Sequence, residues 1–243
     1  MANLDPRTGY APAGSATRAG VAYDEGLRKY MLSVYNIMAS GVLLTGLVAL
    51  GFASSGMAAQ VFGAPGILKY VIMFAPLGIA LWLGFGINRL SEGAAQGLFW
   101  TYAVLMGLSL STIFLVYTGA SIASTFFASA AAFAGLSLYG YTTKRDLGPI
   151  GTFLIMGVIG LIIASLINMF VQSSALGWAI SAIGVLVFAG LTAYDTQKIK
   201  GMYFELGGSS FRGKAIILGA LTLYMDFINL FLFLLRFMGN QRQ

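Results

Sequence analysis

Two aspartates stand within segments that are otherwise apolar enough to cross a bilayer. Asp226 lies inside the stretch 213–236, and Asp195 lies near the end of the preceding apolar segment, 176–199. A carboxylate inside a membrane span is costly, so such a residue marks a functional site by default. The spacing of 31 residues between them, with a polar loop in between, predicts facing positions on two antiparallel helices. The remaining acidic residues fall in the N-terminal segment or in loops: Asp5, Asp24, Glu25, Glu92, Asp146 and Glu205.

The chemistry of such a pair depends on whether the carboxyl groups meet. In a low-dielectric interior two adjacent carboxylates cannot both ionise cheaply, so the pair would share one proton. It can then act as a pH-sensitive latch or attract a cation. Calcium takes about 6–8 oxygen ligands, and Asp195 and Asp226 supply only part of that set. A calcium site on these residues would therefore be weak or transient, and no other cofactor is indicated.

The depth of the two residues sets a condition on this hypothesis. If residues 201–212 form a loop at the membrane face, Asp195 lies one or two turns inside it. Asp226 then lies about 20 Å along its own helix, at 1.5 Å per residue. The carboxyl groups meet only if the helix of Asp195 runs past Lys200, or if the next helix starts late or is tilted.

A cationic partner is also present. Arg89 ends the second apolar segment, on the same side of the membrane as Asp195. An arginine–carboxylate pair is a strong, directional interaction, so Arg89 can act as a latch that plugs a pathway. The alternative is that Arg89 only marks the membrane boundary.

Composition places the chain in a membrane and excludes several kinds of chemistry. It is 58% hydrophobic and 9% charged, whereas soluble domains are about 25% charged. It contains neither cysteine nor histidine. This excludes disulfides, cysteine nucleophiles, the usual zinc sites and Ser-His catalysis. The basic residues behind the net charge of +6 cluster at segment ends, which indicates membrane topology and not nucleic-acid binding.

The spans follow from stretches without charge, at residues 30–68, 93–143 and 147–194. A transmembrane helix needs about 20 mostly apolar residues. We therefore predict an all-α polytopic membrane protein with a disordered cytoplasmic tail at 1–24 and a seven-helix transmembrane domain at 25–243. The predicted helices cover residues 30–53, 67–88, 95–117, 121–143, 148–171, 176–199 and 214–238.

Lysine and arginine placement predicts the orientation. One side carries Arg7, Arg18, Arg28, Lys29, Arg89, Lys144, Arg145, Lys198, Lys200, Arg212 and Lys214, and the other carries Lys69, Arg236 and Arg242. Basic residues concentrate on the cytoplasmic side of membrane proteins. The N-terminus is thus expected in the cytoplasm and the C-terminus outside.

Four segments of the chain resemble a known family. Residues 191–200 (LTAYDTQKIK) and 221–231 (LTLYMDFINLF) are similar to the two hallmark segments of the Bax inhibitor-1 family, also called the transmembrane Bax inhibitor motif family. Residues 135–147 and 159–168 resemble its bacterial branch. The resemblance runs from about residue 25 to the C-terminus.

The resemblance implies a fold, a site and partners. It implies seven helices with the seventh at the centre of a bundle made by the other six. It also implies a pH-dependent calcium leak, with Asp195 and Asp226 as a pair that senses protons and calcium and Arg89 as the latch of the closed state. The implied setting is a bacterial inner membrane, and the implied partners are lipid, calcium or another cation, and a membrane-anchored AAA protease.

Two other functions fit parts of the pattern. An intramembrane aspartyl protease also places an acid after a tyrosine, as at Tyr194-Asp195, and a second acid on the next helix. Asp226, however, lacks the Gly-x-Gly-Asp pattern of those enzymes, and no Pro-Ala-Leu segment follows, so we do not expect an enzyme. The second alternative is a membrane regulator of a protease or stress pathway that transports nothing.

Overall fold

Helices make up nearly all of the chain that the structure describes. The computed structural model describes residues 14–207 and 209–242, and no strand occurs within these ranges. The elements are α1 (Gly14–Ser54), α2 (Met57–Gly63), α3 (Leu68–Gly86), η1 (Ile87–Arg89), α4 (Glu92–Leu110), α5 (Ile113–Val116), α6 (Gly119–Thr142), α7 (Gly148–Val171), α8 (Ser174–Leu206) and α9 (Arg212–Met238).

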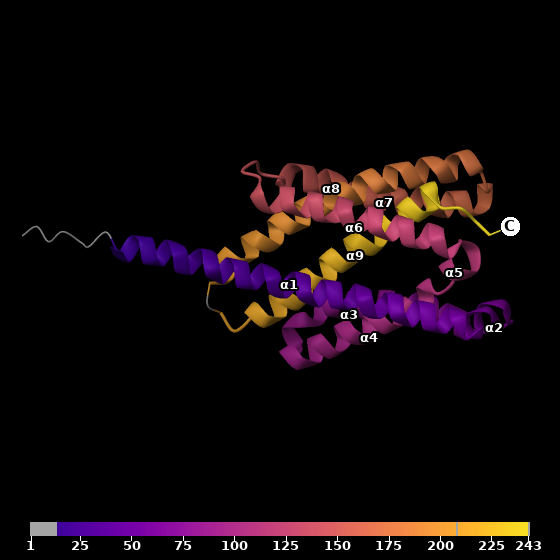
Figure 1. The fold of residues 1–243 in the computed structure, drawn as a ribbon, viewed down its shortest axis with the longest axis horizontal. Coiled ribbons are helices and arrows are strands. Elements are labelled where there is room, and N and C mark those ends of the chain that lie inside the picture. The colour runs from indigo at the N-terminus through magenta and orange to yellow at the C-terminus, as the bar shows by residue number, and fades with distance from the viewer. Residues whose placement is uncertain (1–13, 208, 243) are drawn as a thin grey trace, which may run out of the picture.

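Seven of the helical segments in the described ranges are long and apolar enough to cross a membrane. They are Glu25–Ser54, Leu68–Arg89, Glu92–Val116, Gly119–Thr142, Gly148–Val171, Ser174–Leu206 and Arg212–Met238. The predicted fold class, an all-α protein with seven membrane spans, is confirmed. Figure 1 shows the spans running along one common direction, as a bundle that crosses a bilayer must.

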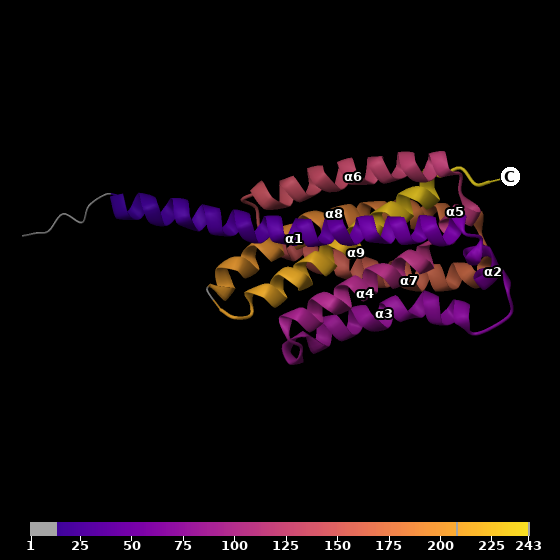
Figure 2. The same cartoon turned by 60° about the horizontal axis from the view of Figure 1, so that its bottom comes forward.

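The last helix, α9, lies at the centre of the bundle. It contacts α1, α3, α4, α6 and α8, and it runs between the other helices in both views (Figures 1 and 2). In its most apolar stretch 61% of the residues are buried, against 17–39% in the other six spans. No residue from Phe211 to Leu235 is exposed. An apolar helix in a membrane can face lipid, but the carboxyl group of Asp226 is costly in hydrocarbon, so a central position suits the helix that carries it.

Several helix ends differ from the ranges predicted by charge. The helical range of α1 takes in residues 14–24 of the expected disordered tail, a stretch with no proline to interrupt a helix, while residues 1–13 lie outside the described part. The segment expected at 95–117 is α4 followed by the short α5. Most important for the site, α8 continues to Leu206.

The turns sort into two ends of the bundle. The connections α3–α4, α6–α7 and α8–α9 lie at one end, and α2, α5 and the C-terminal residues lie at the other (Figure 1). Backbone hydrogen bonds tie the C-terminal residues to the start of α6, from Thr118 N to Asn240 O at 3.1 Å and from Arg242 N to Val116 O at 2.8 Å. The end with the three turns carries most of the basic residues. Its cytoplasmic placement stays a prediction.

Candidate functional site

The two aspartates sit on neighbouring, antiparallel helices at nearly the same depth. Asp195 lies 11 residues before Leu206, the last residue of α8, and Asp226 lies 14 residues after Arg212, the first residue of α9. At 1.5 Å per residue these are about 17 Å and about 21 Å from the connecting turn. The condition that the helix of Asp195 must run past Lys200 is therefore met.

The structure brings the two carboxyl groups together. The side chains of Asp195 and Asp226 lie within hydrogen-bonding reach of each other. Both are buried, with exposed fractions of 9% and 4%. The Oδ2 atom of Asp226 is buried and has no hydrogen-bond partner among the described residues. Since two adjacent carboxylates repel each other in a dry site, this arrangement is stable when a proton lies between them.

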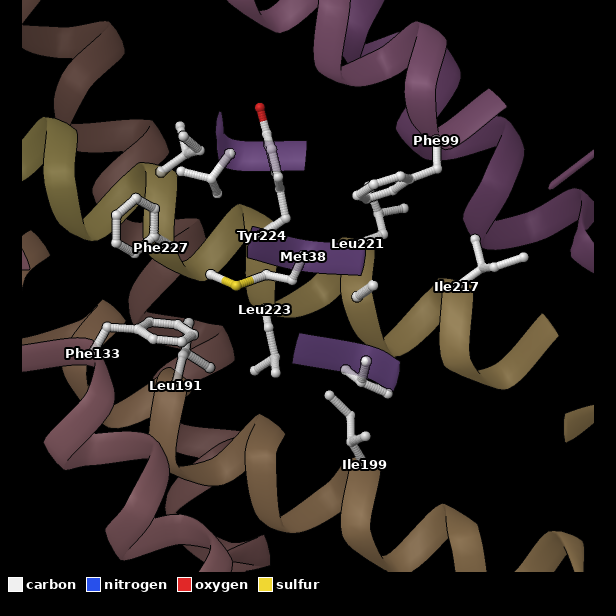
Figure 3. Close-up of a cluster of buried hydrophobic side chains, with 14 of the residues drawn as sticks. Met38, Phe99, Phe133, Leu191, Ile199, Ile217, Leu221, Leu223, Tyr224 and Phe227 are labelled. Carbon is white, nitrogen blue, oxygen red and sulfur yellow. The ribbon is translucent and has the colours of Figure 1, made fainter. Parts of the chain in front are cut away.

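Apolar side chains enclose the pair. Leu191 and Ile199 stand one turn before and one turn after Asp195 on the same face of α8. Leu223 stands one turn before Asp226 on α9. All three are buried members of one hydrophobic cluster (Figure 3). This setting excludes bulk water from the acids and makes their interaction strong.

A chain of hydroxyl groups borders Asp195. Thr196 Oγ1 donates to the carbonyl oxygen of Thr192 at 2.8 Å, so its oxygen can only accept from Ser137 Oγ, at 2.9 Å. Ser137 then accepts a hydrogen bond from the hydroxyl of Tyr35. The hydroxyl groups therefore donate in one direction, from α1 through α6 to α8. It fixes the residue next to Asp195 relative to two other helices.

Two glycines let the neighbouring helices approach the Asp195 segment closely. A Cβ atom on Gly140 of α6 would lie 2.1 Å from the carbonyl oxygen of Ala193. A Cβ atom on Gly151 of α7 would lie 2.3 Å from the ring of Tyr194. A larger residue at position 140 would push the α8 backbone away, and one at position 151 would displace the Tyr194 ring. The backbone that carries Asp195 is thus held by its neighbours on both sides.

Arg89, the predicted latch, does not contact the aspartates in this arrangement. It is exposed in η1 and forms no ion pair with any described side chain. The basic side chain that acts electrostatically on Asp195 is Lys198, one turn later on α8. Its ammonium group is exposed and lies 5.9 Å from the centre of the Tyr194 ring. The role of Arg89 stays a prediction.

The end of α8 also holds the loop between α6 and α7. The side chain of Gln197 donates to Arg145 O at 2.8 Å and accepts from Leu147 N at 2.9 Å. Lys200 Nζ donates to Tyr141 O at 2.8 Å. Sequence reasoning assigned no role at the site to Gln197, Lys198 or Ser137. The available signal was their position in the segments that carry the family resemblance.

Comparison with known proteins identifies the family. The sequence profile of a family described as "Inhibitor of apoptosis-promoting Bax1" matches residues 27–243. The chain belongs to the Bax inhibitor-1 family. An uncharacterized protein of Rickettsia prowazekii is 52% identical over 96% of this chain and 98% of its own length, and one of Caulobacter vibrioides is 47% identical over 98% and 99%.

A third relative bears on location. The inner membrane protein YbhL of Escherichia coli is 49% identical over 89% of this chain and 94% of its own length. With the seven apolar helices, this makes the Bax inhibitor-1 family chain a multi-pass protein of a bacterial inner membrane. The resemblance seen in the four sequence segments is confirmed.

The donor set of the site limits how it can hold a metal ion. Among the described residues of this Bax inhibitor-1 family protein, no group of three acidic, histidine or cysteine side chains gathers around one point. Asp195 and Asp226 alone leave much of a calcium shell of about 6–8 oxygens unfilled. The residues fit a cation that passes through, with water or carbonyl oxygens completing its shell, better than one that stays.

A cavity lies beside α9, near the end of the bundle that carries α5. Its volume is about 310 Å³, and it lies among α1, α4, α5, α6 and α9. Phe227 and Ile228, the residues that follow Asp226, belong to its lining. Thr45 is the only polar side chain in its lining. Such an apolar wall does not support a hydrated cation, so this arrangement is closed at that level.

Proposed function

We propose that this Bax inhibitor-1 family protein is a pH-sensitive leak channel for calcium or another cation, gated by Asp195 and Asp226. The observation that supports the proposal is the pair of buried carboxyl groups, contributed by α8 and the central α9, within hydrogen-bonding reach of each other. An ionisable pair inside a membrane protein is costly to bury, so its presence indicates a functional site.

The proposed gate works through the charge of the pair. With one shared proton the two carboxyl groups hold α8 and α9 together, as in the arrangement described here. When that proton leaves, two like charges face each other in a low-dielectric site, and their repulsion favours separation of the helices. Separation admits water and a cation, whose charge offsets that of the carboxylates. Lys198 and Arg89 are the cations from α8 and η1 that tune this balance.

Arg89 belongs to the proposal as a latch that acts from the basic end of the bundle. Its element, η1, lies next to the start of α9, where Lys214 Nζ donates to Asn88 O at 3.4 Å. A short movement of this turn relative to α9 changes the distance between the guanidinium and the pair. Arg89 then stabilises the ionised aspartates without opening the pathway.

The test is calcium flux into proteoliposomes across the neutral range of pH. For the wild type we expect a flux that changes with pH. Asp226→Asn removes one charge of the pair, so its flux should not depend on pH. Asp146→Asn makes the same chemical change at an exposed loop residue and should behave as the wild type does. Arg89→Ala should raise the leak. Identical traces for all four proteins would overturn the proposal.

The cavity lining favours a second candidate function. Among the described residues, Thr45 is the only polar side chain in the lining of the cavity beside α9, and such an apolar wall suits a protein that senses pH and transports nothing. Such a protein would regulate a partner in the membrane, for example a membrane-anchored AAA protease. No flux at any pH, together with crosslinking to such a protease that Asp226→Asn alters, would select this function over the channel.

A further inference from the structure

A groove opens sideways from the bundle between α1 and α6. These two helices both pack against α8 and α9. At the basic end they leave between them a cavity of about 550 Å³. Its lining comes from Arg28, Met31, Leu32 and Tyr35 of α1 and from Phe133, Ala134, Ser137, Leu138 and Tyr141 of α6. We call this cavity the α1–α6 groove.

Each helix lines the groove with a single face. The α1 residues follow the i, i+3, i+4, i+7 spacing, and the α6 residues repeat at three to four positions, so the groove runs parallel to the helix axes. Its length is that of about seven helical residues, or about 10 Å. Leu32 and Leu138 on its rim are 47% and 63% exposed. Because both helices are membrane spans, this rim faces the bilayer.

The two ends of the groove differ in chemistry. Arg28 lies three residues from the start of its span and Tyr141 one residue from the end of its own, so both stand at the membrane boundary. Arg28 is exposed and forms no ion pair with another described side chain. Toward the middle of the bilayer the lining is apolar apart from Tyr35 and Ser137. The protons of those two hydroxyl groups are already used in the chain to Thr196.

We propose that the α1–α6 groove binds a phospholipid with an anionic headgroup, its phosphate against Arg28 and the upper part of one acyl chain along the groove. Among the described residues the apolar interior offers no free donor for a polar occupant, and the mouth offers the exposed guanidinium of Arg28, which matches a phosphate oxygen by charge and geometry. The opening toward the bilayer means that the occupant enters from the membrane. The volume is within the range of about 300–1,000 Å³ that is usual for small-molecule sites.

This proposal does not depend on ion conduction. It does place the lipid against Tyr35, the first member of the hydroxyl chain that ends beside Asp195. An occupant of the groove therefore borders the side chains that fix the Asp195 segment.

The experiment is photo-crosslinking of the full-length protein in nanodiscs. One preparation contains phosphatidylglycerol with a diazirine in the upper part of its acyl chain, and a second contains phosphatidylcholine with the same group. Crosslinked peptides are mapped by mass spectrometry. We expect crosslinks concentrated on residues 31–35 and 133–138. We also expect the anionic lipid to be favoured about fivefold, which corresponds to about 1 kcal/mol for one basic residue at an anionic membrane surface.

Four variants distinguish specific binding in the α1–α6 groove from general contact with lipid. Arg28→Gln should abolish the preference for phosphatidylglycerol, while Lys29→Gln, the same charge change on the adjacent exposed residue, should keep it. Ala134→Trp fills the groove and should reduce crosslinking there with both lipids. Ala132→Trp, on an exposed face of α6 outside the groove, should not.

The wild-type map alone can overturn the proposal, whether or not a variant folds. Crosslinks spread evenly over the exposed faces of α3 and α7 as well as α1 and α6 would show ordinary contact with lipid. Equal labelling by the two lipids would remove the role of Arg28. An equal loss of preference in Arg28→Gln and Lys29→Gln would assign it to general surface charge.

Discussion

Replacing Gly140 by alanine tests how the Asp195 segment is held. The added Cβ atom would lie 2.1 Å from the carbonyl oxygen of Ala193 and 2.9 Å from its Cα atom. Non-bonded heavy atoms settle at about 3.5 Å, so α6 and α8 must separate by about 1.4 Å at this point. Both atoms of Ala193 belong to the backbone, so no side-chain rotation relieves the clash. Overpacking of this kind lowers the free energy of unfolding by about 1–3 kcal/mol.

The assay is thermal unfolding of the full-length protein in detergent, with flux as a second readout. For a chain of this size each kcal/mol shifts Tm by about 2–4 °C, so Tm should fall by about 2–12 °C. Because Ala193 is two residues before Asp195, the shift of α8 also moves that carboxyl group. The pH response of calcium flux should therefore weaken in Gly140→Ala, as we also expect for Asp226→Asn.

Gly135→Ala is the matched control on the same helix. No atom lies within 4 Å of the Cβ position at Gly135. Alanine there brings only its better helix propensity, about 0.8–1.0 kcal/mol. Tm should be unchanged or higher, and the pH response of calcium flux should be unchanged. If Gly140→Ala were as stable as Gly135→Ala, α6 and α8 would not touch at this point. A lower Tm with a normal pH response would show that α6 does not position Asp195.

Two further substitutions test contacts around the site. Tyr224 donates its hydroxyl proton to Thr45 at 2.6 Å, because Thr45 itself donates elsewhere. Tyr224→Phe should therefore lower the free energy of unfolding by about 1 kcal/mol, measured as a fall in Tm, whereas Tyr139→Phe at an exposed position should change nothing. Gln197→Leu breaks both hydrogen bonds to the loop between α6 and α7. Limited trypsin digestion within that loop should then speed up about tenfold, while Gln96→Leu on an exposed face of α4 leaves it unchanged. Equal cleavage rates in the two glutamine variants would contradict the role of Gln197 in holding this loop.

The spans could be predicted because the rule behind them is local. A charged side chain is excluded from hydrocarbon, so a charge-free stretch of sufficient length indicates a helix. The same rule fails at helix ends. It ended the sixth span at residue 199, whereas α8 runs to Leu206, because a helical backbone continues into water when one face stays buried. Ile199 and Tyr203 supply that face, with exposed fractions of 2% and 9%.

The contacts around Asp195 could not be predicted, since they depend on which helices meet. A threonine in a membrane helix often bonds only the carbonyl four residues earlier, as Thr192 does with Phe188 O. Thr196 does the same and also accepts from Ser137, fifty-nine residues away in sequence. Nothing local distinguishes the two threonines. Gly140 likewise resembles any other glycine of a membrane helix until α8 is placed against it.

The meeting of the two carboxyl groups is a property of the helix pair and of neither helix alone. In this pair of helices the side chain of Ile199 packs against Gly219 of α9, and the ring of Phe233 packs against Gly184 of α8. Asp195 and Asp226 lie between these two close contacts. An α-helix turns about 100° per residue, so a slip of one residue in α9 would carry the carboxyl group of Asp226 off the shared face. The glycine contacts on either side oppose such a slip, and they therefore protect the register on which the proposed gate depends.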